Sequence, residues 1–146
     1  MSADLTISIG QCSDRGIKSI NQDFHGSLVP EQPALGSKGI AIAIADGISS
    51  SSVSQVAAET AIKSFLTDYY CTSDTWSVKT SAYRVIAATN SWLFSQTRRG
   101  GHAEDLDRGY VCTLSAMVLK SRTAHIFHGG DARVFRIASS AREQLT

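Results

Sequence analysis

The chain lacks the long apolar segments and the excess of positive charge that mark two common classes of protein. Its longest apolar run is Ile40–Ala45, far short of the ~20 residues that cross a bilayer. Lys and Arg number 14 against 13 Asp and Glu, a formal net charge of +1. Nucleic-acid-binding domains carry a basic patch and a high pI. We therefore expect no membrane span and no nucleic-acid partner.

Cysteine is scarce, and its spacing fits neither a disulfide framework nor a zinc site. Cys12, Cys71 and Cys112 make an odd number without a C-x-x-C pair. We expect buried free thiols in a reducing compartment, and hence a cytoplasmic protein. Met1–Asp4 contains no basic segment leading into an apolar stretch, so no secretory signal is expected.

Two prolines and 11 glycines among 146 residues, with 42% hydrophobic residues, argue against disorder and in favour of a packed core. The length suits one globular domain, residues 1–146. No internal repeat is apparent. Composition alone therefore describes an ordinary globular chain and leaves its function open.

Alternation of apolar and polar residues predicts several strands. It is found in Leu5–Ile9 and, more weakly, in Phe24–Val29. Ile40–Ala45 is apolar throughout and fits a strand buried on both faces. We expect the segment between them, residues 30–39, to be a loop because it holds both prolines and two glycines.

The middle of the chain has the apolar periodicity of two helices. One runs from Val53 to Cys71, with Ser52 and Gln55 spaced as a capping box. The other runs from Ser77 to Gln96 and ends at a Gly-Gly pair.

After the helices, the pattern returns to strands in residues 110–120, 123–128 and 131–138, which we interpret as an antiparallel meander. Strands and helices that are segregated along the chain favour the α+β class.

Two aspartates lie where strands are expected to end or begin. Asp46 follows the apolar strand, and Asp131 follows a Gly-Gly turn. Burial of an unpaired carboxylate is costly, so we expect each aspartate to have a partner. It could cap a turn or helix, form a salt bridge or bind a metal ion. Mg²⁺ and Mn²⁺ prefer carboxylate and carbonyl oxygen. The spacing alone leaves all three explanations open.

Four short segments stand out by their order and spacing. They are Ser13–Asp23, which ends in Asn-Gln-Asp; Ala43–Gly47, which ends in Asp-Gly; Tyr110–Ala116; and His128–Phe135, which contains Gly-Asp-Ala-Arg. Together they resemble the motifs of the metal-dependent protein phosphatases (the PPM or type-2C family). The resemblance extends over essentially the whole chain and matches roughly the first three fifths of a typical family domain.

The resemblance implies an α-β-β-α sandwich that is C-terminally incomplete here, with a site for two Mn²⁺ or Mg²⁺ ions at one end of its sheets. By position, Asp46 matches the aspartate that bridges both ions, and Gly47 matches a residue that offers its carbonyl oxygen. Asp23 matches an acidic residue of the metal shell, and Gln22 stands where many members carry a glutamate. Asp131 matches an aspartate that helps to hold a third ion in bacterial members.

Lys18 matches the arginine that binds the substrate phosphate, and so joins Asp46 as a candidate catalytic residue. An ammonium is a point charge, whereas a guanidinium is a two-pronged donor. Ser49–Ser52 replaces a glycine-rich stretch that usually follows the Asp-Gly pair. His102, His125 and His128 are weighed as general acids, but for His125 and His128 a structural role in a strand is favoured.

The function implied is that of a bacterial-type Ser/Thr phosphoprotein phosphatase, a signalling hydrolase that cleaves phosphomonoesters with a metal-activated water. Its partners would be a phosphoprotein substrate and a Ser/Thr kinase, or a kinase domain in the same protein. The family's later motifs supply two more metal aspartates that this sequence lacks, which favours a fragment and reduced activity of this chain alone. The alternative is a catalytically impaired regulatory module that binds phosphoprotein.

Overall fold

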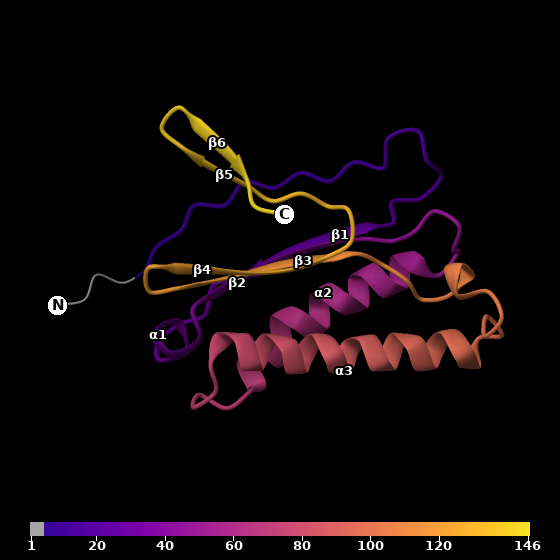
Figure 1. Cartoon of the computed structure of the whole chain (residues 1–146), viewed down its shortest axis with the longest axis horizontal. Helices are drawn as coiled ribbons and strands as arrows, with labels where there is room; N and C mark the ends of the chain where they lie inside the picture. Colours follow the sequence, from indigo (N-terminus) through magenta and orange to yellow (C-terminus); the bar gives the residue numbers. More distant parts are fainter. Residues whose placement is uncertain (1–4) are drawn as a thin grey trace.

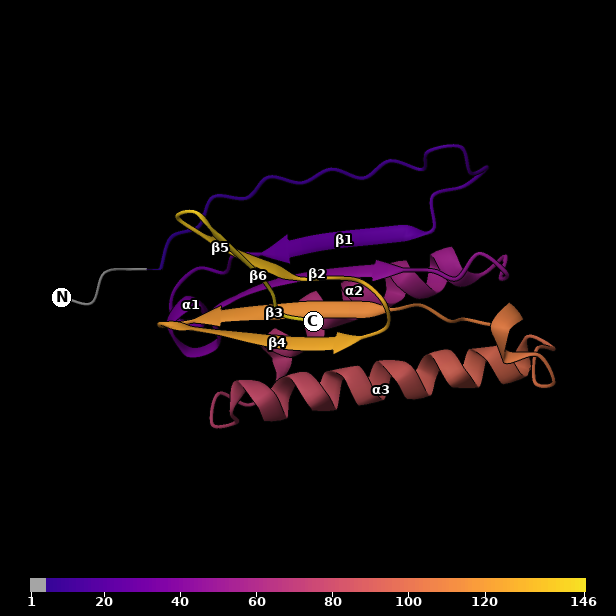
Figure 2. The same ribbon diagram turned by 45° about the horizontal axis from the view of Figure 1, so that its top comes forward.

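The computed structural model describes residues 5–146 and shows a four-stranded antiparallel sheet with two long helices on one face (Figure 1). The sheet has the order β1-β2-β3-β4. Its strands are β1 (Asp23–Leu28), β2 (Ile40–Asp46), β3 (Leu114–Lys120) and β4 (Thr123–Gly129). Figure 2 shows the four strands side by side. The α+β class is confirmed; the interpretation of Met1–Asp4 lies outside the described residues.

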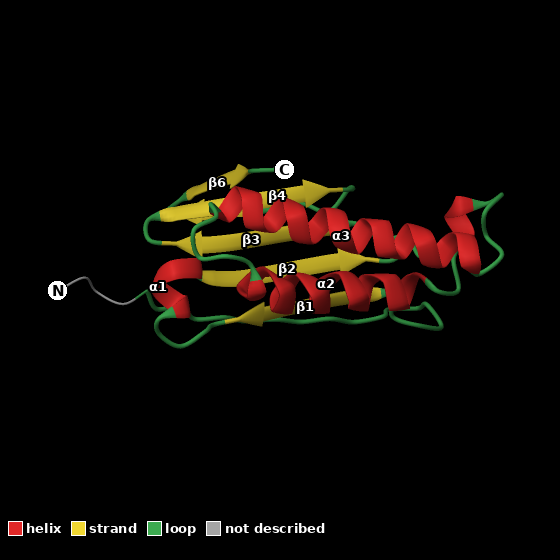
Figure 3. Cartoon of the chain, turned by 90° about the horizontal axis from the view of Figure 1, so that it is seen from below, coloured by secondary structure: helices red, strands yellow, loops and turns green. Residues whose placement is uncertain are grey.

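Helices α2 (Ser54–Cys71) and α3 (Val78–Arg99) cover the sheet from below, as Figure 3 shows. Small residues let α2 lie close to the strands: Ala41, Ala43 and Ala45 alternate along β2 and are buried in one cluster with Ile62 and Phe65. This is the main core of the molecule, and it holds the strand that ends in Asp46.

Both long helices occur where the sequence predicts them, but only one begins as expected. Ser77 caps α3, and its hydroxyl accepts a hydrogen bond from the Thr80 N–H at 3.0 Å. The capping box predicted from Ser52 and Gln55 is wrong. Val53 precedes α2 without a side-chain cap, and its N–H donates to the Ser51 hydroxyl at 3.2 Å.

The opposite face of the sheet is only partly covered. β2 was expected to be buried on both faces, and this is wrong, because Ile44 is 49% exposed while its neighbours Ala43 and Ala45 are buried. A cavity of about 340 Å³ lies on this open face, lined among others by Ile42, Met117 and Val134. The alternation of Ile and Ala separates an inner face of small residues from an outer face of large ones.

The N-terminal segment and a C-terminal hairpin approach the open face. Leu5–Ile9 was predicted to be a strand, and this is wrong: the segment is irregular, and Ile9 lines the open-face cavity. Strand β5 (Phe135–Ala138) does not continue the meander; it pairs with β6 (Ala141–Gln144) in a separate hairpin. Residues 131–134, predicted as part of that strand, form a bend and a loop.

Two smaller expectations also fail. Residues 30–39 hold a short helix, α1 (Ala34–Lys38), where a loop was predicted. The cysteines are free, as expected, but Cys12 and Cys71 are exposed and Cys112 is half-buried. Among residues 5–146 no helix combines the length and apolar character needed to cross a membrane.

Candidate metal and phosphate site

The predicted acidic residues Asp23 and Asp46 lie opposite each other where β1 begins and β2 ends. Burial raises the pKa of Asp46, and the neighbouring Asp23 carboxyl raises it further, by hydrogen bonding to the protonated form of Asp46 and by its negative charge. The antiparallel register therefore brings together two carboxylates that are 23 residues apart in the sequence.

The backbone of Asp46 is held from the neighbouring strand. Its N–H donates to the Thr113 hydroxyl at 3.1 Å, and its carbonyl accepts from the Thr113 N–H at 2.8 Å. On the other side, the Gly47 N–H donates to the Gln22 carbonyl at 3.0 Å. Asp46 therefore projects from a rigid position between two segments of the chain.

Gly47 lies where only glycine fits without displacement. A Cβ atom at this position would lie 2.7 Å from the Ser54 carbonyl oxygen, at the beginning of α2. The entry of α2 therefore packs directly against the Asp-Gly pair.

Lys18 approaches the acidic pair from the N-terminal segment. Its positive charge lowers the pKa of Asp46, which partly opposes the effects of burial and Asp23. Its Nζ donates to the Ser49 hydroxyl at 3.3 Å. A pocket of about 150 Å³ has Lys18 and Asp23 in its lining, together with Arg15. Two cationic side chains, Lys18 and Arg15, and two carboxylates, Asp14 and Asp23, thus lie around one space.

Asp131 lies in the bend after β4, and its charge adds to the rise in the pKa of Asp46. The bend needs glycine, because Gly130 has a φ of 122° and a Cβ there would lie 2.5 Å from Thr113. His128 holds the same bend: its Nε2 donates to the Gly130 carbonyl at 3.0 Å, and its Nδ1 lies 2.8 Å from the Ser115 hydroxyl. The structural role favoured for His128 is confirmed.

Gln22 lies beside the acidic pair but is turned toward the loop that follows it. Its side chain is buried, and its amide nitrogen lies within hydrogen-bond distance of the Ile48 and Ser51 carbonyls and of the Ser54 hydroxyl, which share its two hydrogens. The metal role predicted for Gln22 could fall only to its amide oxygen, because a neutral side-chain amide binds a hard cation through oxygen.

The donor set suits a hard divalent cation, although it is small. Asp23, Asp46 and Thr113 line a pocket of about 180 Å³. Asp46, whose pKa is raised, lies beside a second carboxylate, so a cation that neutralises both would stabilise the pair. Carboxylate oxygen is the donor that Mg²⁺ and Mn²⁺ prefer. In the part of the chain that the structure describes, no three Asp, Glu, His or Cys side chains converge as a metal cluster. The residues thus fit part of a metal shell.

Comparison with known protein families identifies the family to which the chain belongs. The family model for protein phosphatase 2C matches residues 13–144. The chain belongs to the protein phosphatase 2C family. The match extends from the segment that carries Lys18 to the end of β6, and thus includes every predicted site residue.

One solved protein phosphatase 2C structure shows how much of the fold is present. The crystal structure of the Mycobacterium tuberculosis serine/threonine phosphatase PstP/Ppp is similar, with a TM-score of 0.68 and 19% sequence identity. The match covers 89% of this chain and 49% of the PstP chain, so the phosphatase 2C fold is incomplete here. No curated protein sequence matches the chain.

Sequence reasoning missed the residues that support the site. Thr113 forms hydrogen bonds with both the N–H and the carbonyl of Asp46. The one feature of the sequence that could have identified Thr113 is its place within the segment Tyr110–Ala116. Ser51 and Ser54 had no signal beyond their place in or beside a serine-rich run. Their partners are distant in sequence, so only the folded chain identifies them.

Proposed function

We propose that the chain is part of a divalent-metal-dependent Ser/Thr phosphoprotein phosphatase of bacterial type. The observation that carries this proposal is the Asp23–Asp46 pair at one end of the sheet, with Lys18 close enough to lower the pKa of Asp46. Membership of the protein phosphatase 2C family supports it. PstP/Ppp, a serine/threonine phosphatase, supplies the substrate class by analogy.

In this proposal, Asp46, Gly47 and Asp23 hold Mn²⁺ or Mg²⁺, two ions in all, and Asp131 takes part in holding a third. When bound, such ions supply Lewis-acid chemistry: they neutralise phosphate oxygens and lower the pKa of water. Asp46 is rigidly held by Thr113, so the donor atoms are positioned before any ligand arrives. No protein nucleophile is required.

Lys18 binds the phosphate group of the substrate. Its ammonium lies on the same side as the acidic pair, and its hydrogen bond to Ser49 restrains it there. A single cation on a flexible stem binds phosphate as a point charge, without the bidentate geometry of arginine. We therefore expect Lys18→Arg to lower KM for a phosphopeptide without loss of kcat.

The proposed setting is cytoplasmic signalling, opposite a Ser/Thr kinase that phosphorylates the same protein substrate. Free cysteines, two of them exposed, are compatible with a reducing compartment. The proposed unit is a single domain that corresponds to residues 1–146, with the remainder of the metal shell supplied from outside this chain.

The second candidate function is a phosphatase-like module that binds phosphoprotein without turnover. The observation that favours it is the small donor set: within residues 5–146, no third acidic or imidazole side chain joins Asp23 and Asp46 in one cluster. Such a module would keep Lys18 as its phosphate ligand. Binding without hydrolysis distinguishes it from the first candidate.

The test is Mn²⁺-dependent hydrolysis of p-nitrophenyl phosphate, measured on this chain and on any longer product of its reading frame. Asp46→Asn should abolish activity and weaken Mn²⁺ binding at least tenfold, because it removes a charged donor from the pair. Asp68→Asn, on the exposed surface of α2, is the matched control and should change neither. Unchanged Mn²⁺ binding by Asp46→Asn would refute the metal assignment.

A further inference from the structure

Gln22 and the serines of residues 49–52 lie far apart in the sequence and meet in the folded chain. In the structure, the Gln22 amide nitrogen lies 2.9 Å from the Ser51 carbonyl oxygen and 3.2 Å from that of Ile48. A carbonyl oxygen only accepts hydrogen bonds, so these contacts require the amide nitrogen, and not a carboxylate oxygen, to face the loop.

A third contact of the same nitrogen reaches the beginning of α2. The Ser54 hydroxyl lies 2.7 Å from the Gln22 nitrogen and itself donates to the Ile48 or Ser51 carbonyl. Ser54 is completely buried, and Gln22 is 6% exposed. The Gln22 amide and the Ser54 hydroxyl therefore share the Ile48 and Ser51 carbonyls as acceptors, and these hydrogen bonds hold the segment from Gly47 to Ser54 against Gln22.

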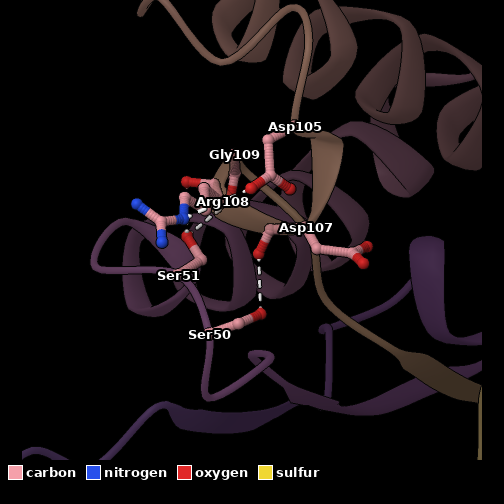
Figure 4. A network of polar contacts seen from close by, with 6 residues as sticks. All are labelled: Ser50, Ser51, Asp105, Asp107, Arg108 and Gly109. Atoms are coloured by element: carbon pink, nitrogen blue, oxygen red, sulfur yellow. Dashed lines mark hydrogen bonds and ion pairs between the residues drawn. The ribbon is translucent and has the colours of Figure 1, made fainter.

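The serine run extends these contacts to the segment between α3 and β3, as Figure 4 shows. The Ser51 hydroxyl lies 2.6 Å from the Gly109 carbonyl oxygen and 3.0 Å from that of Arg108. The Ser50 hydroxyl donates to the Asp107 carbonyl at 2.7 Å. A glycine-rich loop has no side chains to make any of these bonds.

We propose that Gln22 is a positioning residue of the site, and that with Ser50, Ser51 and Ser54 it forms a polar latch. The latch holds Gly47 and Ser49 in place on one side and fixes residues 107–109 on the other. It deepens the proposed function, because Gly47 and the Ser49 partner of Lys18 belong to the metal and phosphate site. Its physical basis does not depend on a bound metal.

The latch and a direct metal role for Gln22 predict opposite effects of Gln22→Glu. A carboxylate cannot donate to the Ile48 and Ser51 carbonyls, so the latch predicts a lower melting temperature in the presence of EDTA, by roughly 5–10 °C. If Gln22 acts chiefly as a ligand, the added charge raises Mn²⁺ affinity and leaves the melting temperature in EDTA unchanged, and that result would overturn the proposal.

Hydrogen exchange measured in EDTA shows which residues lose protection when the Gln22 hydrogen bonds are removed. With Gln22→Glu, amides of residues 47–54 and 107–109 should exchange about tenfold faster, while those of α3 keep their protection. Uniform loss of protection, α3 included, would mean that Gln22 contributes only to global stability and would overturn the positioning role.

A second pair of variants keeps the test decisive if Gln22→Glu does not fold. Ser54→Ala removes one partner of the Gln22 nitrogen, and Ser52→Ala changes an exposed serine of the same run. We expect faster exchange at residues 47–54 for Ser54→Ala and no change for Ser52→Ala. Equal behaviour of the two variants would overturn the latch. The stability and exchange measurements are made without metal. Failure of the wild-type chain to bind Mn²⁺ would therefore reject the proposed function but would leave the latch unaffected.

Discussion

The two faces of the four-stranded sheet are built by the same strands and have opposite character. On the helix side, Ala43 and Val118 are buried in the core cluster with residues of α2 and α3. On the other side, Ile44 is 49% exposed and a cavity of about 340 Å³ separates the sheet from the segments above it. The alternation of side chains along each strand therefore places them on one face or the other, whereas their burial requires a second layer that covers the face.

The position of the site follows from this difference. Asp46 ends β2, the strand with one buried and one open face, and Asp23 begins its neighbour β1. The helix-covered core holds the strands rigid, while the end of the sheet remains open to ligands.

Phe65→Ala should destabilise the chain by about 3–5 kcal/mol, because it empties the core between α2 and the sheet. Phe135→Ala is the matched variant on the other side: its ring lies on β5 and is 41% exposed, so we expect a loss of about 1 kcal/mol or less. Urea denaturation measures both. Equal losses would contradict the difference between the two faces.

The buried side should also produce an alkaline loss of stability. Burial raises the pKa of Tyr69 from its ordinary value of about 10 to about 12. Between these two values the unfolded chain releases a proton that the folded chain retains, so stability falls as pH rises through this range, by on the order of 2 kcal/mol.

Thermal denaturation from pH 8 to pH 11.5 measures this slope in the wild type and in Tyr69→Phe. The variant loses the hydrogen bond from the Tyr69 hydroxyl to the Lys38 carbonyl, so it should be about 1 kcal/mol less stable at pH 8. Its alkaline slope should be shallower than that of the wild type. Identical slopes would show that the Tyr69 phenol is not protected from solvent.

Ile44→Thr should have the smallest effect, below about 1 kcal/mol, because half of the Ile44 side chain is already in water and threonine keeps the β-branched shape that suits a strand. The measurement is urea denaturation at two protein concentrations. A loss above about 2 kcal/mol would mean that the open face is buried in solution, and a concentration dependence would identify self-association as the cause.

Much of the fold could be predicted from local patterns. The apolar periodicity of Val53–Cys71 and Ser77–Gln96 and the alternation in residues 123–128 correspond to α2, α3 and β4 of the structure. The errors occur where a pattern does not specify its partner. Leu5–Ile9 alternates like a strand but does not pair with one, and β5 pairs with β6 instead of continuing the sheet.

The site could be predicted only in part, for the same reason. Asp46, Asp23 and Lys18 were found because they occupy recognisable motifs, and the structure brings them together. Thr113 and Ser54 act through hydrogen bonds to residues that are distant in sequence or hidden at a helix entry. Their side chains are ordinary until the chain folds, so no local signal distinguishes them.

The amino-acid sequence by itself determined the family and the order of the main elements, and it indicated the residues proposed to bind metal and phosphate, because each depends on short motifs and local periodicity. The tertiary structure decided which face of the sheet is covered, which strand pairs with which, and how Gln22 uses its amide group. Those outcomes depend on contacts between distant segments. Such contacts exist only when the entropy lost in closing the chain is offset by the packing that closure allows.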